Sequence, residues 1–493
     1  MARLCRGTTA QRKLCRAYTI QLMGGERANS QGAQKAEEAR TAGVVASLRR
    51  RLLSGGAWSF ASRVIGAFTT LASNILLARL LSPQGLGAYF LAFSLVTAAS
   101  LLSLMGLDQA VVRFLGESVG LNQFERARRV LRKVLILGML GALALGISYL
   151  FFGYFVERFL LHAPELVQVT GLVALWMVVV AVQLLLAETF RGLHDIRLAS
   201  IFFSLANGVL LAAFLGVLWL LEGQASLAVV ILLAVGSNLV SVILAAILLY
   251  RRVASLPLGS EADATTGFGE IIRVGLPLMV VNMSLLVLSQ GWVDLWILSA
   301  FHPEEEVAVF GAAARLGFLV AMPILVVNSV VSPLIAQMYA QGRQQELELA
   351  LRAAATLAAI LAFVALIGFV VLGGPVLGLV FGDYYRAGAM ALALLSIAQF
   401  VNVWVGPSGI FLTMAGHQTA AMVITIAGGF VMIVAGIGLA GPYGATGVAV
   451  ATAAGVIVTN VSYWLVVKRK TGIWTHAGLR GFSSLIRIAR RAA

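Results

Sequence analysis

The chain of 493 residues is 60 % hydrophobic and only 12 % charged, about half the charged fraction of a soluble globular protein. Together with a mean hydropathy of +0.93, this composition excludes an ordinary soluble protein. The net charge of +15 does not indicate a nucleic-acid partner, because most Lys and Arg residues lie between apolar runs, where they act as topology signals. The two cysteines, Cys5 and Cys15, both lie in the basic N-terminal tail. No disulfide framework, metal site or cofactor is therefore expected.

The order of apolar and polar segments predicts an all-α integral membrane protein. Residues 1–50 are polar, rich in arginine and without hydrophobic periodicity, which predicts a disordered basic cytoplasmic tail. From Gly55 onward, apolar runs of about twenty residues recur, each long enough to cross roughly 30 Å of hydrocarbon as a helix. A break between the last two runs is predicted at Gly441-Pro442-Tyr443-Gly444, because proline lacks an N–H donor and glycine frees the backbone. We predict twelve membrane spans: 55–80, 85–112, 130–153, 166–190, 197–221, 226–250, 269–298, 306–336, 351–381, 387–414, 417–440 and 444–467.

Lys and Arg residues are distributed unevenly between the two sides of the membrane. With the N-terminus in the cytoplasm, 31 of the 36 fall in segments on the cytoplasmic side. A bias of this size places both ends of the chain in the cytoplasm, in agreement with an even number of spans. The predicted location is the bacterial cell membrane, as a multi-pass protein.

Features of the first half of the chain recur in the second half at offsets of 220, 221 and 222 residues. They are Pro83 and Pro303, Leu86–Tyr89 and Val307–Phe310, and Gly120–Gln123 and Gly342–Gln345. Because each half has an even number of spans, six, both halves enter the membrane from the same side. This predicts a parallel repeat about an axis along the membrane normal. Such repeats are typical of transporters that bind substrate between two lobes rocking against each other. We predict a six-helix lobe over 51–250, a cytoplasmic linker over 251–268 and a second six-helix lobe over 269–468.

Residues 469–493 are predicted to form a cytoplasmic tail. Beyond Ile473, apolar residues recur at spacings near 3.6 and are accompanied by arginines: Leu479, Phe482, Leu485, Ile486 and Ala489. This pattern predicts a basic amphipathic helix lying in the membrane interface. A frayed tail is the alternative.

Three charged residues lie inside apolar spans, where a charge is costly and usually functional. Arg63 lies about two helical turns inside the first span, Asp294 lies seven residues before Phe301, and Arg315 lies nine residues after Glu306. At 1.5 Å per residue, Asp294 and Arg315 lie about 10 and 13 Å from the outer side, so they could meet. Either they form an ion pair that joins two helices, or they face a central cavity and bind substrate. Both can hold, since a paired arginine can exchange its partner for a phosphate.

Polar residues within the spans are further candidates for a substrate site: Asn74, Asn282 and Gln290. Hydrogen bonds between helices are the commoner role of such residues, and lining a cavity for sugars is the alternative. Asp108 and Arg113 close the second span at the cytoplasmic boundary and are predicted to form a gate or an anchor. Glu188 and Arg191 are expected to pair at the interface. No nucleophile–base pair, carboxylate pair or phosphate-binding glycine loop stands out, so no enzyme is expected.

The segment Trp58–Glu117 has a characteristic order of elements. An apolar helix leads into Leu81-Ser82-Pro83, a second helix begins with Gly87-Ala88-Tyr89, and it leaves the apolar region through Gly106–Phe114. This order resembles the polysaccharide-transport family, flippases for lipid-linked oligosaccharides, within the superfamily that also holds the multidrug and toxin extrusion exporters. The family's second half typically carries an Asp in the seventh span and a Val-Gly-x-Tyr-x-x-Ala-x-Arg-Leu-like start to the eighth. Here Asp294 and Val307–Leu316 match it in part, with Ala308 in place of Gly and Phe310 in place of Tyr.

The resemblance implies a transporter that moves a polyprenyl-diphosphate-linked oligosaccharide to the outer leaflet by alternating access, for cell-surface polysaccharide biosynthesis. Arg63 and Arg315 would then bind the anionic diphosphate. The expected partners are the lipid-linked glycan, membrane lipids, a coupling ion (H⁺ or Na⁺) and other surface-glycan assembly proteins. A multidrug exporter of the same superfamily is the alternative, but it would be expected to place carboxylates in its cavity. A membrane-bound glycan polymerase or acyltransferase is a third interpretation. Such an enzyme would be expected to carry a large outer loop. The longest predicted outer loop covers only residues 153–165, which argues against this interpretation.

Overall fold

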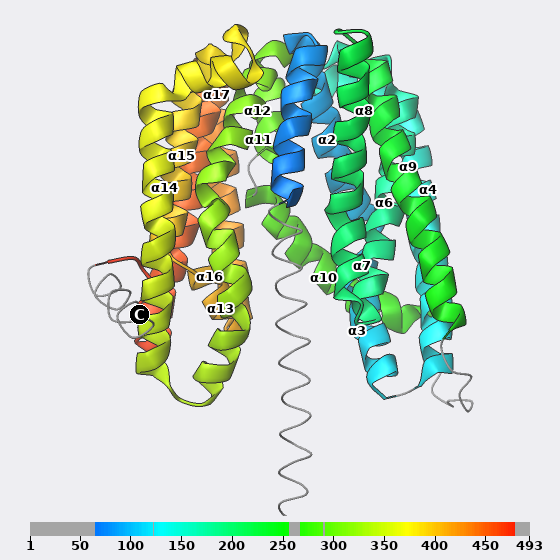
Figure 1. Cartoon of the computed structure of the whole chain (residues 1–493), viewed down its shortest axis with the longest axis vertical. Coiled ribbons are helices and arrows are strands. Elements are labelled where there is room, and N and C mark those ends of the chain that lie inside the picture. The colour runs from blue at the N-terminus through cyan, green and yellow to red at the C-terminus, as the bar shows by residue number, and fades with distance from the viewer. Residues whose placement is uncertain (1–64, 122, 256–266, 289–290, 479–493) are drawn as a thin grey trace, which may run out of the picture. The chain divides into compact units, whose positions relative to one another are not determined.

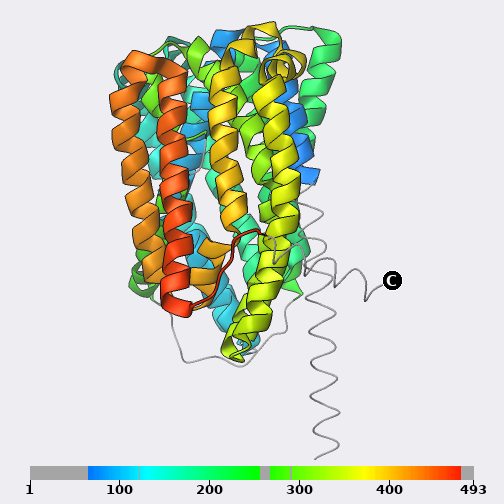
Figure 2. The same cartoon turned by 90° about the vertical axis from the view of Figure 1, so that its left-hand side faces the viewer.

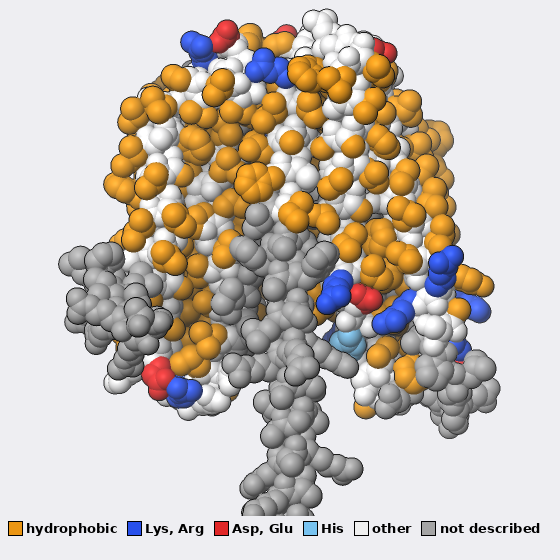
Figure 3. Space-filling view, viewed as in Figure 1, with side chains coloured by type: hydrophobic (Ala, Val, Ile, Leu, Met, Phe, Trp, Pro, Cys, Tyr) orange, Lys and Arg blue, Asp and Glu red, His pale blue; other side chains and the backbone are white. Residues whose placement is uncertain are grey.

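A computed structural model of the chain describes residues 65–121, 123–255, 267–288 and 291–478. Within these ranges all regular secondary structure is helical. Nine helices of the described residues are long and apolar enough to cross a membrane. Hydrophobic side chains cover most of the face shown in Figure 3, and charged side chains gather near its two ends. Phe151 and Leu220 are each 77 % exposed, as expected of side chains that face lipid rather than water.

The helices of the first lobe lie on one side of Figure 1. The helix Ile65–Leu80 comes first, and α2 begins at Pro83 behind Ser82, whose hydroxyl accepts from the backbone N–H of Gly85 at 3.1 Å. Serine as N-cap followed by proline is a strong helix start. The remaining elements are α3 (Leu107–Gly120), α4 (Phe124–Phe155), α5 (Pro164–Val167), α6 (Thr170–Gly192), α7 (Ile196–Ser200), α8 (Ala206–Leu221) and α9 (Leu227–Ala254); α2 ends at Ser103.

The second lobe repeats this plan, and most of it lies on the other side of Figure 1 and faces the viewer in Figure 2. Its first helix extends across toward the first lobe. Its elements are α10 (Phe268–Leu288), α11 (Val293–Ser299), α12 (Glu304–Gly317), α13 (Met322–Ala340), α14 (Gln344–Phe381), α15 (Ala389–Val405), α16 (Ser408–Met414) and α17 (Gln418–Thr471). The predicted break in the last apolar run is confirmed, because Gly444 in α17 has φ +53° and ψ −137°. The chain turns back there, so that Gly455 packs against Met432. With α17 counted twice, and the helix Ile65–Leu80 and α10 included, the described helices account for the twelve predicted spans.

Three predicted spans are broken at residues with positive φ, which corrects the sequence-based boundaries. The second breaks at Met105 and Gly106, which have φ +50° and +76°. The seventh divides into α10 and α11. The tenth breaks at Gly406, with φ +79°, just before Pro407. Gly291, just before α11, has φ +83°. Positive φ is costly for residues with a Cβ, so a glycine at each of these three breaks marks where the backbone leaves the helix.

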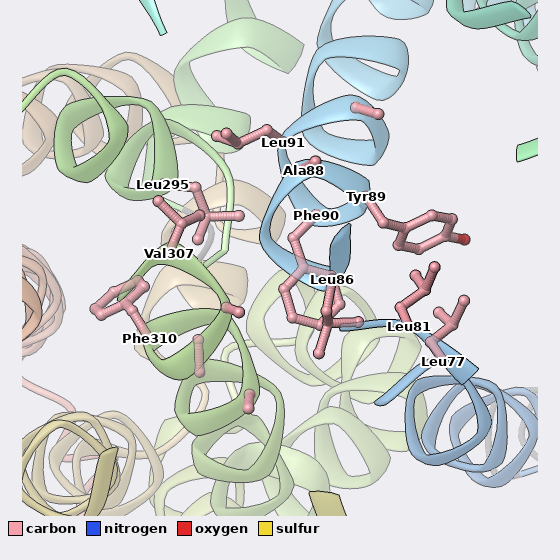
Figure 4. Close-up of a cluster of buried hydrophobic side chains, with 14 of the residues drawn as sticks. Leu77, Leu81, Leu86, Ala88, Tyr89, Phe90, Leu91, Leu295, Val307 and Phe310 are labelled. Atoms are coloured by element: carbon pink, nitrogen blue, oxygen red, sulfur yellow. The ribbon is translucent and has the colours of Figure 1, made fainter. Parts of the chain in front are cut away.

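Helices α2 and α12 occupy equivalent places in the two halves and pack directly against each other. We call the end of the bundle where both begin the outer end, since topology predicts that it faces outside; it is uppermost in Figure 1. Leu86 and Phe90 of α2 and Val307 and Phe310 of α12 are fully buried in one apolar cluster (Figure 4). Gly87 allows this approach, because a Cβ there would lie 1.8 Å from the backbone oxygen of Glu304. Small residues at such crossings are the usual means of close helix packing in membranes.

The segment that follows α17 is not helical from Ile473 to Gly478. The residues that carry the predicted amphipathic helix, from Leu479 to Ala489, lie outside the described ranges, so that helix stays a prediction. Thr475 is fully buried and its hydroxyl donates to the Val405 carbonyl at 2.9 Å. The His476 imidazole lies within 5.5 Å, centroid to centroid, of three tryptophan rings. Burial, together with the nearby Arg352 guanidinium, lowers the pKa of His476. The segment therefore runs as a strap across the ends of α14 and α15, because its backbone amides and Thr475 have partners there that a helix would not reach.

Candidate functional site

Arg315 of α12 lies at the junction of the two lobes. Its Nε donates to Asn74 Oδ1, on the first-lobe helix Ile65–Leu80, at 2.9 Å. Its Nη1 donates to the Gly311 carbonyl at 3.1 Å. The guanidinium carbon lies 3.4 Å from the centroid of the Phe90 ring of α2, well inside the range of a cation–π contact. The arginine predicted from sequence is thus held by groups from both lobes.

The space for this arrangement comes from Gly311, one turn before Arg315. A Cβ at Gly311 would lie 2.3 Å from Cδ2 of Phe90 and 3.3 Å from Nη1 of Arg315. Glycine therefore lets the ring and the guanidinium stack beside the helix backbone. Among the described residues, the hydrogen bonds of Arg315 use Nε and Nη1. The planar guanidinium carries five N–H donors and stays charged when desolvated, so Nη2 keeps donors for an anion.

Asp294 does not form the ion pair with Arg315 that the sequence left open. Its Oδ1 accepts from the backbone N–H groups of Trp292 and Leu295, at 2.7 and 3.0 Å, and its Oδ2 accepts from Gly291 at 3.1 Å. Asp294 lies in the first turn of α11 and is 1 % exposed, so its carboxylate satisfies amides that the helix start leaves without partners. Neither residue belongs to an ion pair among the described residues. The two charges attract each other only at longer range.

This geometry predicts which double-mutant cycle shows coupling. Asn74→Ala combined with Arg315→Met should be non-additive by about 0.5–3 kcal/mol, because the two side chains share a hydrogen bond. Asp294→Ala combined with Arg315→Met should show a smaller coupling, because the carboxylate is engaged by backbone amides. Thermal unfolding of the purified variants in detergent measures both cycles. A larger coupling energy in the Asp294 cycle than in the Asn74 cycle would instead support an ion pair between Asp294 and Arg315.

Aromatic side chains of both lobes also meet at the lobe junction; of these, only Tyr89 lies in a motif that the sequence analysis quoted, at the start of the second helix. Tyr89 and Phe93 of α2 stack with a centroid distance of 6.5 Å and an interplanar angle of 6°. Phe93 also contacts Trp292 of the second lobe, with centroids 5.5 Å apart. Trp296 Nε1 donates to Ser94 Oγ across the same junction at 2.8 Å. We call Tyr89, Phe93 and Trp292 the aromatic bank. Phe93 is 37 % exposed, so the bank has a face available to a bound molecule.

The structure does not place the other predicted site residues beside Arg315. Arg63 and Gln290 lie outside the described ranges, and the side chain of Asn282 in α10 is likewise not described. Asp108, at the start of α3, is 4 % exposed and accepts from Gln109 Nε2 at 3.3 Å, whereas Arg113 is exposed. Their role as a gate stays a prediction. The expected pair of Glu188 and Arg191 is confirmed, at 2.8 Å.

Two solved structures that share this fold are each described by their own function. One, described as the inward-facing conformation of a multidrug resistance MATE family transporter of the MOP superfamily, aligns with a TM-score of 0.64 at 17 % identity, over 87 % of this chain and 96 % of that one. Another, lipid II flippase MurJ in an inward closed conformation, aligns with a TM-score of 0.64 at 16 % identity, over 89 % and 92 % of the two chains. The fold is thus the two-lobed bundle of about twelve helices.

The sequence comparisons narrow the class to a family. The chain belongs to the family described as polysaccharide biosynthesis protein, which matches residues 52–339. The MatE family matches residues 277–440. The probable low-salt glycan biosynthesis flippase Agl15 of Haloferax volcanii is 27 % identical over 174 residues, which are 35 % of this chain and 36 % of that protein. The aligned part thus spans about a third of this relative's length. The resemblance to polysaccharide transporters predicted from the sequence is confirmed.

Proposed function

We propose that the protein flips a polyprenyl-diphosphate-linked oligosaccharide from the cytoplasmic to the outer leaflet, for cell-surface polysaccharide biosynthesis. The observation that carries this proposal is the guanidinium of Arg315, held at the lobe junction by a neutral amide, a carbonyl and an aromatic ring. Arg315 forms no ion pair with a carboxylate in the part of the chain that the structure describes, and such a cation inside a membrane bundle suits an anionic cargo. Arginine binds phosphate oxygens with several donors at once. The aromatic bank beside it offers flat faces for the apolar faces of sugar rings.

Contacts between the lobes at the outer end support alternating access as the mechanism. Besides Asn74 with Arg315, the bonds from Trp296 to Ser94 and from Arg79 Nη2 to the Leu379 carbonyl, at 3.0 Å, join the lobes on this side. Rocking of the lobes would break these few polar bonds and separate α2 from α12. Such rigid-body motion is the usual route by which a repeated bundle exposes a central site alternately to each side.

A multidrug exporter is the second candidate, favoured by the match of residues 277–440 to the MatE family. An exporter of cations would be expected to bind them through a carboxylate free to attract a positive charge. Asp294 is a poor candidate for that role, because three backbone amides occupy its oxygens and it is 1 % exposed. The charge arrangement around Arg315 therefore favours the anionic cargo.

Transport by purified protein in proteoliposomes tests the proposal. Arg315→Ala and Arg63→Ala should each lower flipping of a fluorescent polyprenyl-diphosphate oligosaccharide at least about tenfold, which corresponds to the loss of one charge-assisted contact of about 1.5–3 kcal/mol. Arg315→Lys should retain part of the rate, since it keeps the charge but loses the planar fork. Arg386→Ala, in an exposed pair with Asp383 on the same lobe, is the matched control and should leave flipping unchanged. Unaltered flipping by Arg315→Ala at normal abundance would refute the cationic site. Export of a cationic dye without glycan flipping would favour the exporter.

A further inference from the structure

Glu304, the first residue of α12, lies at a close contact between the lobes. Its backbone oxygen is the atom that a Cβ at Gly87 would meet, and the residue is only 3 % exposed. Its side chain faces the first lobe, toward Gln84 of α2 and Glu165 of α5. A carboxyl group of one lobe is therefore enclosed by the other when the outer end is closed.

The carboxyl group of Glu304 has only weak partners and no cationic one among the described residues. Both of its oxygens are buried without a hydrogen bond of ordinary geometry, although the Gln84 amide and the Glu165 backbone approach them. The charged groups that face it are themselves acidic, Glu165 and the adjacent Glu305. No ion pair among the described residues includes Glu304.

Glu306, two residues further along α12, has a carboxylate whose two oxygens both have polar partners. Its Oε2 lies 2.7 Å from Nδ1 of His302, and its Oε1 accepts from the backbone N–H of Ala445 at 2.7 Å. That N–H follows the break at Gly444, where the helix ladder is interrupted. The difference between the two residues is thus one of partners and not of position along the helix.

An ionised Glu304 would be unfavourable in the closed arrangement. An unpaired buried charge is strongly disfavoured, and the nearby acids add repulsion. The positive N-terminal end of α12 favours a negative charge there, but this effect is smaller than the cost of removing an unpaired carboxylate from water. In water, by contrast, a glutamate is ionised at neutral pH. The protonation state of Glu304 therefore depends on whether the lobes touch.

We propose that Glu304 is a proton-binding site that links closure of the outer end to the uptake of one proton. When α2 and α12 are apart, the carboxylate faces the medium at the outer end and takes up H⁺ there to become the neutral acid. The neutral acid fits the enclosed position beside Gln84, so acid at the outer end favours the closed arrangement. Over the pH range in which Glu304 is neutral when closed and ionised when open, the ratio of closed to open molecules rises up to about tenfold for each unit that the pH falls. The link to cargo rests on the proposed function; in that cycle the proton would reset the carrier after cargo release.

Distance measurements between spin labels test this link without any cargo. Labels at Gln224 and Tyr384, both exposed near the outer end of their lobes, are introduced in a background with Cys5→Ala and Cys15→Ala. The purified protein in lipid nanodiscs is measured by double electron–electron resonance from about pH 8.5 to about pH 5.5. We expect the short-distance population to grow as the pH falls.

Glu304→Gln should abolish this response, because the amide is neutral at every pH, and should keep the short-distance population high at the alkaline end. Glu305→Gln, which removes the neighbouring charge, should retain the response and serves as the matched control. A pH response of unchanged size in Glu304→Gln, or none in the wild-type protein, would overturn the proposal. The absence of a pH response in the wild-type protein overturns the proposal even if the Glu304→Gln protein fails to fold. Failure of the glycan assay with an intact pH response would refute the proposed function and leave the proton site standing.

Discussion

Gly87→Ala is expected to hold the outer end open and to stop transport. The new Cβ would lie 1.8 Å from the Glu304 backbone oxygen and 2.6 Å from its carbonyl carbon. Backbone atoms cannot rotate away as a side chain can, so α2 and α12 must separate. Overpacking typically costs about 1–3 kcal/mol, which would lower the closed population about 5- to 150-fold.

The spin-label pair at Gln224 and Tyr384 measures this shift. Gly116→Ala is the matched control, because the nearest atom to a Cβ at Gly116 in α3 is the Gly192 oxygen at 4.0 Å. The control should show the distances and flipping rate of the unsubstituted protein. Equal short-distance populations in the Gly87→Ala and unsubstituted proteins would mean that this crossing does not set the closed state.

The sequence predicted the fold well because membrane spans are governed by local composition. An apolar run of sufficient length must form a helix in lipid, since every backbone group needs an internal partner. The break at Gly441–Gly444 was predictable for the same reason, as it interrupts a run too long for one span. Gly406-Pro407 inside the tenth span is likewise a sequence that favours a helix break. The prediction of a single span there relied on the apolar content of the run and missed it.

The candidate site was only partly predictable, because its contacts join distant parts of the chain. That Arg315 was important followed from a charge at membrane depth. Its partner could not be inferred, since Asn74 lies 241 residues away and Asp294 was a more obvious choice. Asp294 instead binds amides within three residues of itself, which depends on the break between α10 and α11. The burial of Glu304 could not be predicted for a similar reason. Three glutamates follow one another at the start of α12, and only the contact with the first lobe decides which of them is removed from water.

Gly106→Ala is expected to affect the opposite side of the lobe junction, where α10 crosses the corner between α2 and α3. Gly106 has φ +76°, and a Cβ there would lie 2.0 Å from the Gly275 oxygen and 2.9 Å from the Met279 nitrogen of α10. The substitution therefore combines the cost of a left-handed backbone, about 1–2 kcal/mol, with overpacking of about 1–3 kcal/mol. Loosening α10 from the first lobe should lower the unfolding temperature and impair flipping.

Gly342→Ala separates these two costs. Gly342 has φ +70°, and no atom lies within 4 Å of the place that an added Cβ would occupy, so alanine there carries the backbone cost alone. Thermal unfolding of both variants should therefore give a larger loss of stability for Gly106→Ala, and the difference measures the contact with α10. Labels at the exposed residues Leu121 and Gln344, near the inner ends of the lobes, should also report a longer distance only in Gly106→Ala. Equal losses of stability in the two variants would show that α10 gains nothing from this crossing, because strain at the glycine would then explain the whole effect.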